Sequence, residues 1–175
     1  MHYAVNGERK HESLHIMEQL QRTWIEIIRS LFKEEFLDSQ FTQLQMLQDE
    51  NNPDFVFEVV SLFFKDSEMI LNDISDTLSQ PIIDFAKVNA HVHQLKGSSS
   101  SIGARRVKNA CISLRHHCEE RNLHGCRAWM HHLKEEYFLV KAKLETLLRV
   151  IFYPYKPFIK SLTSGIVRIR WSSRS

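Results

Sequence analysis

A histidine, a lysine and a glycine stand at helical spacing in one segment of the 175-residue chain. Lys96 and Gly97 follow His93 by three and four residues, so in a helix all three lie on one face. Imidazole is a competent nucleophile when it is neutral near physiological pH. Lys96 would offset the charge of a phosphoryl group, and Gly97 would leave room for that group and for a partner's backbone. These three side chains would therefore suit a phosphoryl group carried on His93, although by spacing alone an exposed helical histidine is more often an ordinary surface residue.

Apolar residues around this segment recur at intervals of three and four, which indicates amphipathic helices. In the helix expected over 84–102, Val92 and Leu95 point into a core, and His93 lies beside that core face, reachable from solvent. Gly103 is a favourable helix stop. Similar patterns predict further helices over 17–35, from Asp38 to 47, and over 53–80, 107–118 and 123–151.

Five glycines and four prolines in the whole chain favour long helices over a strand-and-turn architecture. We expect an all-α fold, in which the last four helices form an antiparallel up-down-up-down four-helix bundle and two additional N-terminal helices cap or flank it. In a hairpin that turns near Gly103, a residue ten before the turn faces one about twelve after it. Arg115 is therefore expected opposite His93, as a second neighbour of the phosphate or the imidazole.

Composition excludes several function classes. The formal net charge is +2, but residues 152–175 hold five cations and no acid, which leaves a mildly acidic body and argues against nucleic acid as the main partner. No stretch reaches the length of a membrane span, and no glycine-rich nucleotide-binding loop is present. Three cysteines without a spaced framework favour a reducing compartment. We expect a soluble intracellular protein with no cofactor and no membrane insertion.

Three matches in chain order carry a resemblance to a known family. The segments are 93–104 (HQLKGSSSSIGA), 41–45 (FTQLQ) with 47–49 (LQD), and 52–56 (NPDFV) leading into 58–64 (EVVSLFF). Together they resemble the histidine-containing phosphotransfer proteins, in particular the plant proteins of the cytokinin phosphorelay. The resemblance covers about residues 17–151. A bare histidine-x-x-lysine-glycine motif would be a weak signal, but three long matches in order are specific.

The resemblance implies a phosphoryl carrier that is not an enzyme, with His93 as the acceptor. It implies phosphate-neighbouring roles for Lys96, Gly97 and Gln94. The partners it implies are receiver domains of hybrid sensor histidine kinases and of response regulators, which supply the aspartate and Mg²⁺. It also implies a monomer in cytoplasm and nucleus, which docks receivers through its first two helices, with Phe41, Gln43 and Leu44 as contact residues. Some plant relatives carry asparagine at the acceptor position and inhibit the relay, whereas this chain keeps histidine.

The family usually spans about residues 17–151, so we expect the phosphotransfer domain there. Residues 1–16 would be a disordered extension, and residues 152–175 a poorly ordered basic and aromatic extension, for which contact with an anionic membrane surface is the alternative. A docking protein that blocks receivers without carrying phosphate is the main rival function. A zinc site is a further alternative, since several side chains could bind metal: His116, His117, Cys118, His124, Cys126, His131 and His132. Core positions for the two cysteines favour packing instead.

Overall fold

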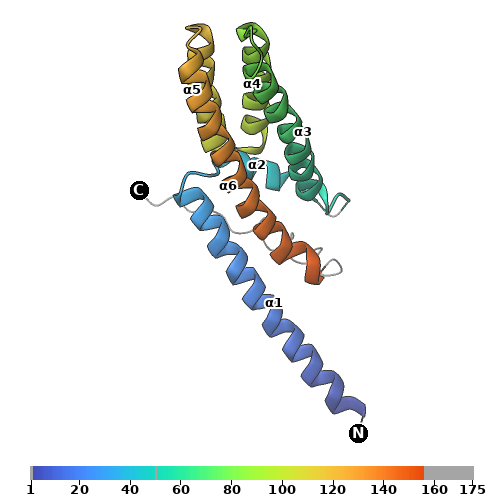
Figure 1. The fold of residues 1–175 in the computed structure, drawn as a ribbon. Coiled ribbons are helices and arrows are strands. Elements are labelled where there is room, and N and C mark those ends of the chain that lie inside the picture. The colour runs from blue at the N-terminus through green and yellow to red at the C-terminus, as the bar shows by residue number, and fades with distance from the viewer. Residues whose placement is uncertain (1, 50, 156–175) are drawn as a thin grey trace.

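The computed structural model describes residues 2–49 and 51–155, and every regular element within them is an α-helix. The all-α class predicted from the sequence is therefore confirmed. The helices, shown in Figure 1, are α1 (His2–Lys33), α2 (Ser39–Met46), α3 (Phe55–Leu78), α4 (Phe85–Ile102), α5 (Arg105–Glu119) and α6 (Leu123–Tyr155).

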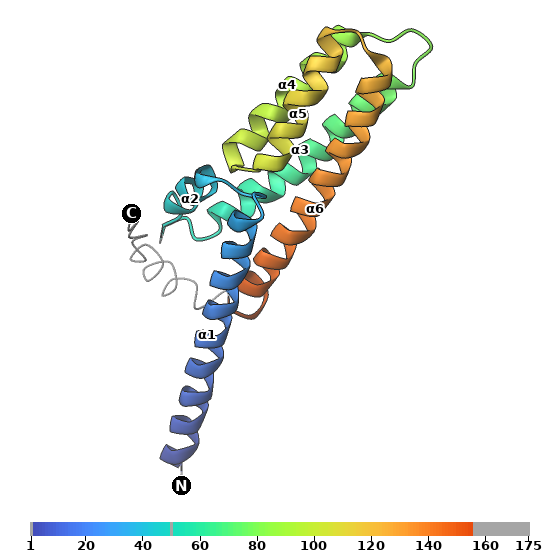
Figure 2. The ribbon, with the colours of Figure 1, turned by 90° about the vertical axis from the view of Figure 1, so that its left-hand side faces the viewer.

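Helices α3 to α6 form the predicted four-helix bundle (Figure 2). Helix α4 packs against α3 and α5, and α6 packs against α5 and α3, so each helix has two neighbours around one core. The apolar stripe of α4 faces inward as expected, with the side chains of Val92 and Leu95 fully buried. The longest stripe, on α6, is buried from Cys126 through Tyr137 to Leu147. The period of the apolar residues thus fixes which face of each helix enters the core.

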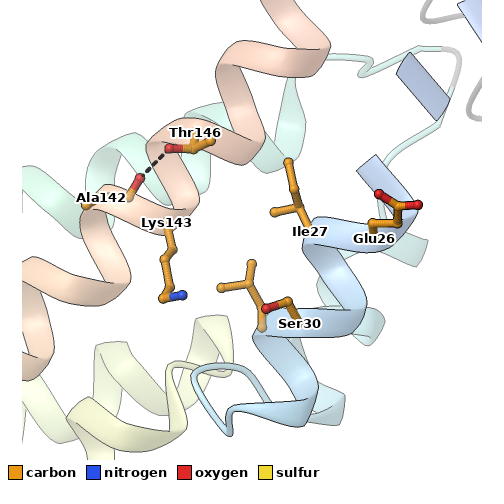
Figure 3. Close-up of a pocket in the computed structure, with 7 residues that line it drawn as sticks. Glu26, Ile27, Ser30, Ala142, Lys143 and Thr146 are labelled. Carbon is orange, nitrogen blue, oxygen red and sulfur yellow. Dashed lines mark hydrogen bonds between the residues drawn. The ribbon is translucent and has the colours of Figure 1, made fainter. Parts of the chain in front are cut away.

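The two N-terminal helices flank the bundle. Helix α1 packs along α6, and its N-terminal half extends beyond the bundle (Figure 1). A shallow surface groove lies along this α1–α6 seam, lined by Ile27 and Leu31 of α1 and by Ala142 and Lys143 of α6 (Figure 3). An ion pair between Lys143 Nζ and Glu34 Oε2, 3.1 Å apart, links α6 to the residue that follows the C-terminus of α1. None of the predicted site residues lines this groove.

A tight corner joins α4 to the segment between α1 and α2. Gly103 ends α4 in the left-handed conformation, with φ of 76°. Its carbonyl accepts from the Asp38 amide at 2.9 Å, and the Arg105 amide donates to the Phe36 carbonyl at 3.0 Å. The Asp38 side chain caps the N-terminus of α2 by accepting from the Gln40 amide. The end of α4 and the start of α2 are therefore held together by backbone hydrogen bonds.

The helix boundaries differ from the expected ones at both ends of the chain. Helix α1 begins at His2 rather than at 17, because residues 8–16 hold helix-forming side chains and no proline. Residues 2–16 thus belong to α1, and the expectation of a disordered extension over 1–16 stays a prediction. Helix α6 continues past Ile151 to Tyr155. The remainder of the expected C-terminal extension, 156–175, lies outside the described residues, and the division into three segments stays a prediction.

The length and mean hydropathy of each helix show whether it could cross a membrane. Over residues 2–49 and 51–155, no helix combines the length and the apolar content that crossing a bilayer requires.

Candidate functional site

His93 lies on the outer side of α4, between two residues of its buried stripe. Val92 and Leu95 are fully buried, whereas His93 is exposed. A turn of about 100° per residue separates neighbours on a helix, which places the imidazole beside the core face and open to solvent. His91, two residues earlier, is half-buried. The geometry therefore presents one ring from a rigid helix to an approaching partner.

Arg115 of α5 reaches across to this ring, where the hairpin argument placed it. Its Nη1 lies 3.2 Å from Nδ1 of His93. A guanidinium is always protonated and can only donate, so Nδ1 accepts this hydrogen bond. The other ring nitrogen, Nε2, is the one that Arg115 does not contact, and in a neutral ring with this contact it carries the proton. The predicted proximity of Arg115 is confirmed, and its role toward phosphate stays a prediction.

Two residues that the sequence analysis missed hold Arg115 in place. The Oδ1 atom of Asn89 accepts from Arg115 Nε at 2.8 Å, and Oε1 of Glu119 lies 3.6 Å from Arg115 Nη2. Their spacing in the sequence could have indicated both residues. Asn89 precedes His93 by one helical turn, and Glu119 follows Arg115 by one turn, so each lies on the same helix face as its neighbour. The guanidinium therefore contacts Asn89 and Glu119 in addition to the His93 ring.

Lys96 lies one turn after His93 and is half-buried. Burial raises the pKa of the Cys111 thiol on α5 to about 12, and the positive charge of Lys96 opposes that rise. The ammonium group is thus near the α4–α5 seam. Among the residues described by the structure, no carboxylate forms an ion pair with Lys96. Its charge is uncommitted in the free protein and available to an incoming anion.

Gly97 faces open space. A Cβ atom built at this position meets no neighbouring heavy atom within 4 Å, so the free protein would accommodate alanine. Gln94, the remaining predicted phosphate neighbour, is exposed beside His93. The position of Gly97 one turn from His93 is compatible with clearance for a partner, since nothing within this chain requires the missing side chain.

Replacing Gly97 by alanine separates the two possible reasons for glycine. We expect Gly97→Ala to stabilise the fold by about 0.5 to 1 kcal/mol, because alanine is the better helix former. We also expect slower phosphoryl transfer, because the added methyl group enters the space above His93. Thermal unfolding and transfer kinetics measure the two effects. Unchanged transfer kinetics would refute the clearance role.

Three hydroxyls of the serine run after Gly97 bond within their own helix. The hydroxyls of Ser98, Ser100 and Ser101 donate to the carbonyls of Leu95, Lys96 and Gly97, and Ser99 is fully buried. These bonds to the preceding turn satisfy the three hydroxyls within α4 itself.

The docking residues expected on α2 need a correction. Phe41 is fully buried and Leu44 is 6% exposed, so neither side chain is available to a partner, whereas Gln43 is exposed. Phe41 packs at the corner where α4 ends, against Gly103. The apolar side chains that α2 and the residue after it do expose are Met46 and Leu47. Phe41 and Leu44 support the surface of α2 from within.

The histidine and cysteine cluster at the α5–α6 end does not converge on a metal. Cys118 and Cys126 are buried with their Sγ atoms 3.6 Å apart. His116 and His131 instead lie 3.3 and 3.4 Å from glutamates one turn away on their own helices. Within residues 2–49 and 51–155, no group of three or more potential ligands could hold a metal ion.

The buried thiols should be chemically silent in the folded protein. Burial raises the pKa of Cys111 and Cys118 to about 12 and also raises that of Cys126, so the reactive thiolate is scarce at pH 8. We expect no reaction with a disulfide reagent such as Ellman's reagent in buffer, and three reactive thiols per chain in denaturant. A fast-reacting thiol in the native protein would contradict this and reveal local opening of the bundle.

Comparison with known proteins adds to this geometry. Residues 58–148 match the family model described as the Hpt domain. Histidine-containing phosphotransfer protein 1 of Arabidopsis thaliana is 58% identical over 132 residues, which cover 75% of this chain and 86% of the relative. The chain belongs to the Hpt family. The family match spans both the helix that carries His93 and the helix that carries Arg115.

Solved structures agree with this assignment. The histidine-containing phosphotransfer protein MtHPt2 from Medicago truncatula superposes with a TM-score of 0.73 at 46% identity, covering 77% of this chain and 91% of that one. Similarity alone does not decide whether an Hpt chain carries phosphate. Pseudo histidine-containing phosphotransfer protein 2 of rice (Oryza sativa subsp. japonica) is 44% identical over 75% of this chain and 87% of its own length. The argument for this Hpt protein therefore rests on His93 and its surroundings.

Proposed function

We propose that this Hpt protein is the phosphoryl carrier of a multistep two-component relay. It accepts a phosphoryl group on His93 from the receiver aspartate of a hybrid sensor histidine kinase. It then passes the group to the receiver aspartate of a response regulator, in cytokinin signalling. The observation that supports this most directly is an exposed imidazole on a rigid helix, flanked by the cations of Lys96 and Arg115.

The chemistry follows from what this chain supplies. With the ring proton on Nδ1, the lone pair of Nε2 attacks the phosphorus of an aspartyl phosphate and the Nε2–P bond forms. The bond from phosphorus to the aspartate oxygen breaks with its electrons on the carboxylate, and the Nδ1 proton is then lost to solvent. Lys96 offsets the negative charge that arrives, about −1.5 to −2 for a phosphate monoester. Transfer onward reverses these steps. The Mg²⁺ and the acidic acceptor belong to the receiver domain, so the chain needs no cofactor of its own.

The same residues support a carrier without kinase or phosphatase activity. The groups around His93 are a nucleophile, two cations and the amide and carboxylate that hold Arg115. We propose that the protein works as a monomer in cytoplasm and nucleus, in keeping with the plant Hpt resemblance. Gln43 and Met46 of α2, with Leu47 directly after it, form the exposed surface that we propose for receiver docking.

Transfer from a radiolabelled, phosphorylated receiver domain tests the carrier function. We expect the label to move to the Hpt protein in the presence of Mg²⁺, and to be lost in acid but retained in alkali, as for phosphohistidine. ATP without a kinase should give no label. A folded chain that binds the receiver but takes no label would instead be a docking protein that blocks receivers.

A further inference from the structure

The guanidinium of Arg115 is fixed from three sides. Its Nε donates to Asn89 at 2.8 Å, its Nη1 to His93 at 3.2 Å, and its Nη2 lies 3.6 Å from Glu119. The Arg115 side chain is only 27% exposed. Asn89 comes from α4 and Glu119 from α5, so the planar group bridges both helices of the hairpin. A planar fork held at all three nitrogens has little freedom to turn away from the ring.

The contact selects one form of the imidazole. Because Arg115 can only donate, Nδ1 must present its lone pair, and the proton of the neutral ring is then on Nε2. Attack on phosphorus through Nε2 requires the opposite arrangement, with the lone pair on Nε2 and the proton on Nδ1. The resting hydrogen bond therefore opposes the attacking form of the ring.

The phosphorylated ring fits the same contact without conflict. Once the Nε2–P bond has formed and the Nδ1 proton has passed to solvent, Nδ1 again has a lone pair that Arg115 can occupy. Loss of the phosphoryl group is easiest when Nδ1 is protonated, because neutral imidazole is then the leaving group. An arginine on Nδ1 competes with that proton and slows the loss.

We infer that Asn89 and Glu119 are positioning residues that hold Arg115 on Nδ1 of His93, and that this clamp lengthens the lifetime of the phosphohistidine. The inference rests on the proposed carrier function and deepens it. The charged groups around this site on the two helices of the hairpin are Lys96, one turn after His93 on α4, and Arg115 with its ion-pair partner Glu119 on α5. Of these, Arg115 is the one in hydrogen-bond contact with Nδ1.

The half-life of the isolated phosphorylated protein is the first test. We expect it to shorten about tenfold in Arg115→Gln and about threefold in Asn89→Ala, because each change removes a hydrogen bond to a charged group. Asn89→Asp keeps an acceptor oxygen for Arg115 Nε and should restore the wild-type half-life. Asn72→Ala, at an exposed asparagine of α3, is the matched control and should change nothing.

Nitrogen-15 NMR of His93 in the unphosphorylated protein is the second test and does not depend on transfer. We expect well-separated ring nitrogens with the proton on Nε2 in wild type, and converging shifts in Asn89→Ala as the two tautomers exchange. A wild-type protein that takes no label would overturn the carrier function and the lifetime role with it. A labelled wild type with the same half-life and ring shifts as Asn89→Ala would overturn this inference alone.

Discussion

Replacing His93 by glutamine will abolish phosphoryl acceptance while leaving the fold intact. Glutamine is close to histidine in size and polarity, and the position is exposed, so neither packing nor the buried stripe of α4 is disturbed. The amide nitrogen of glutamine has no lone pair available for attack on phosphorus, unlike neutral imidazole. Label transferred from a phosphorylated receiver domain should fall to background, with an unchanged helical circular-dichroism spectrum.

The control for this experiment is His91→Gln, two residues away on the same helix. His91 is half-buried and lies about 200° around the helix from His93, so its loss should leave labelling close to wild type. The chain has ten histidines, so the experiment must show which of them accepts the phosphoryl group. Equal labelling of wild type and His93→Gln would show that another histidine is the acceptor.

Gly103→Ala should lower the free energy of unfolding by about 2 to 4 kcal/mol. The left-handed φ of 76° costs a side-chain-bearing residue about 1 to 2 kcal/mol. The new Cβ would also lie 2.6 Å from the Phe41 amide nitrogen and 2.8 Å from Oδ1 of Asp38. The first of these is backbone and cannot rotate away, so α2 must shift off the end of α4. For a domain of this size the midpoint of thermal unfolding should fall by about 5 to 15 °C.

Gly97→Ala is the matched control, since it adds the same methyl group to the same helix where no atom lies within 4 Å. The two variants should move the unfolding temperature in opposite directions. A Gly103→Ala protein as stable as Gly97→Ala would mean that the corner between α2 and α4 relaxes at little cost.

The sequence could place His93 because its position depends only on the period of the apolar stripe. Counting residues from the turn at Gly103 also brought Arg115 to the right level of α5. Asn89 and Glu119 could not be found in this way, because a hydrophobic pattern fixes which face is buried and says nothing about the rotamers of polar side chains on the other face. The contact of Asn89 with Arg115 depends on how α5 is rotated against α4. Glu119 lies one turn after Arg115 on the same helix, so its four-residue spacing was the usable signal there.

The correction at α2 has a different cause. The family resemblance suggested Phe41 and Leu44 as docking residues, but their three-residue spacing is that of a buried face, and both side chains are buried. Leu47, which continues the same spacing, is 65% exposed because α2 ends at Met46. In an eight-residue helix the periodic pattern is too short to show where burial stops.

The corner at Gly103 also sets a fixed spacing between two parts of the surface. Backbone hydrogen bonds tie the start of α2 to the end of α4, and His93 lies nine residues before Ile102 on that helix. At 1.5 Å per residue this amounts to about 14 Å of straight helix. A receiver that contacts α2 while its aspartate meets His93 must therefore match that span. A receiver whose contact loops lie at a different distance from its aspartate could not make both contacts at once. This spacing would therefore select partners independently of the side chains at the interface.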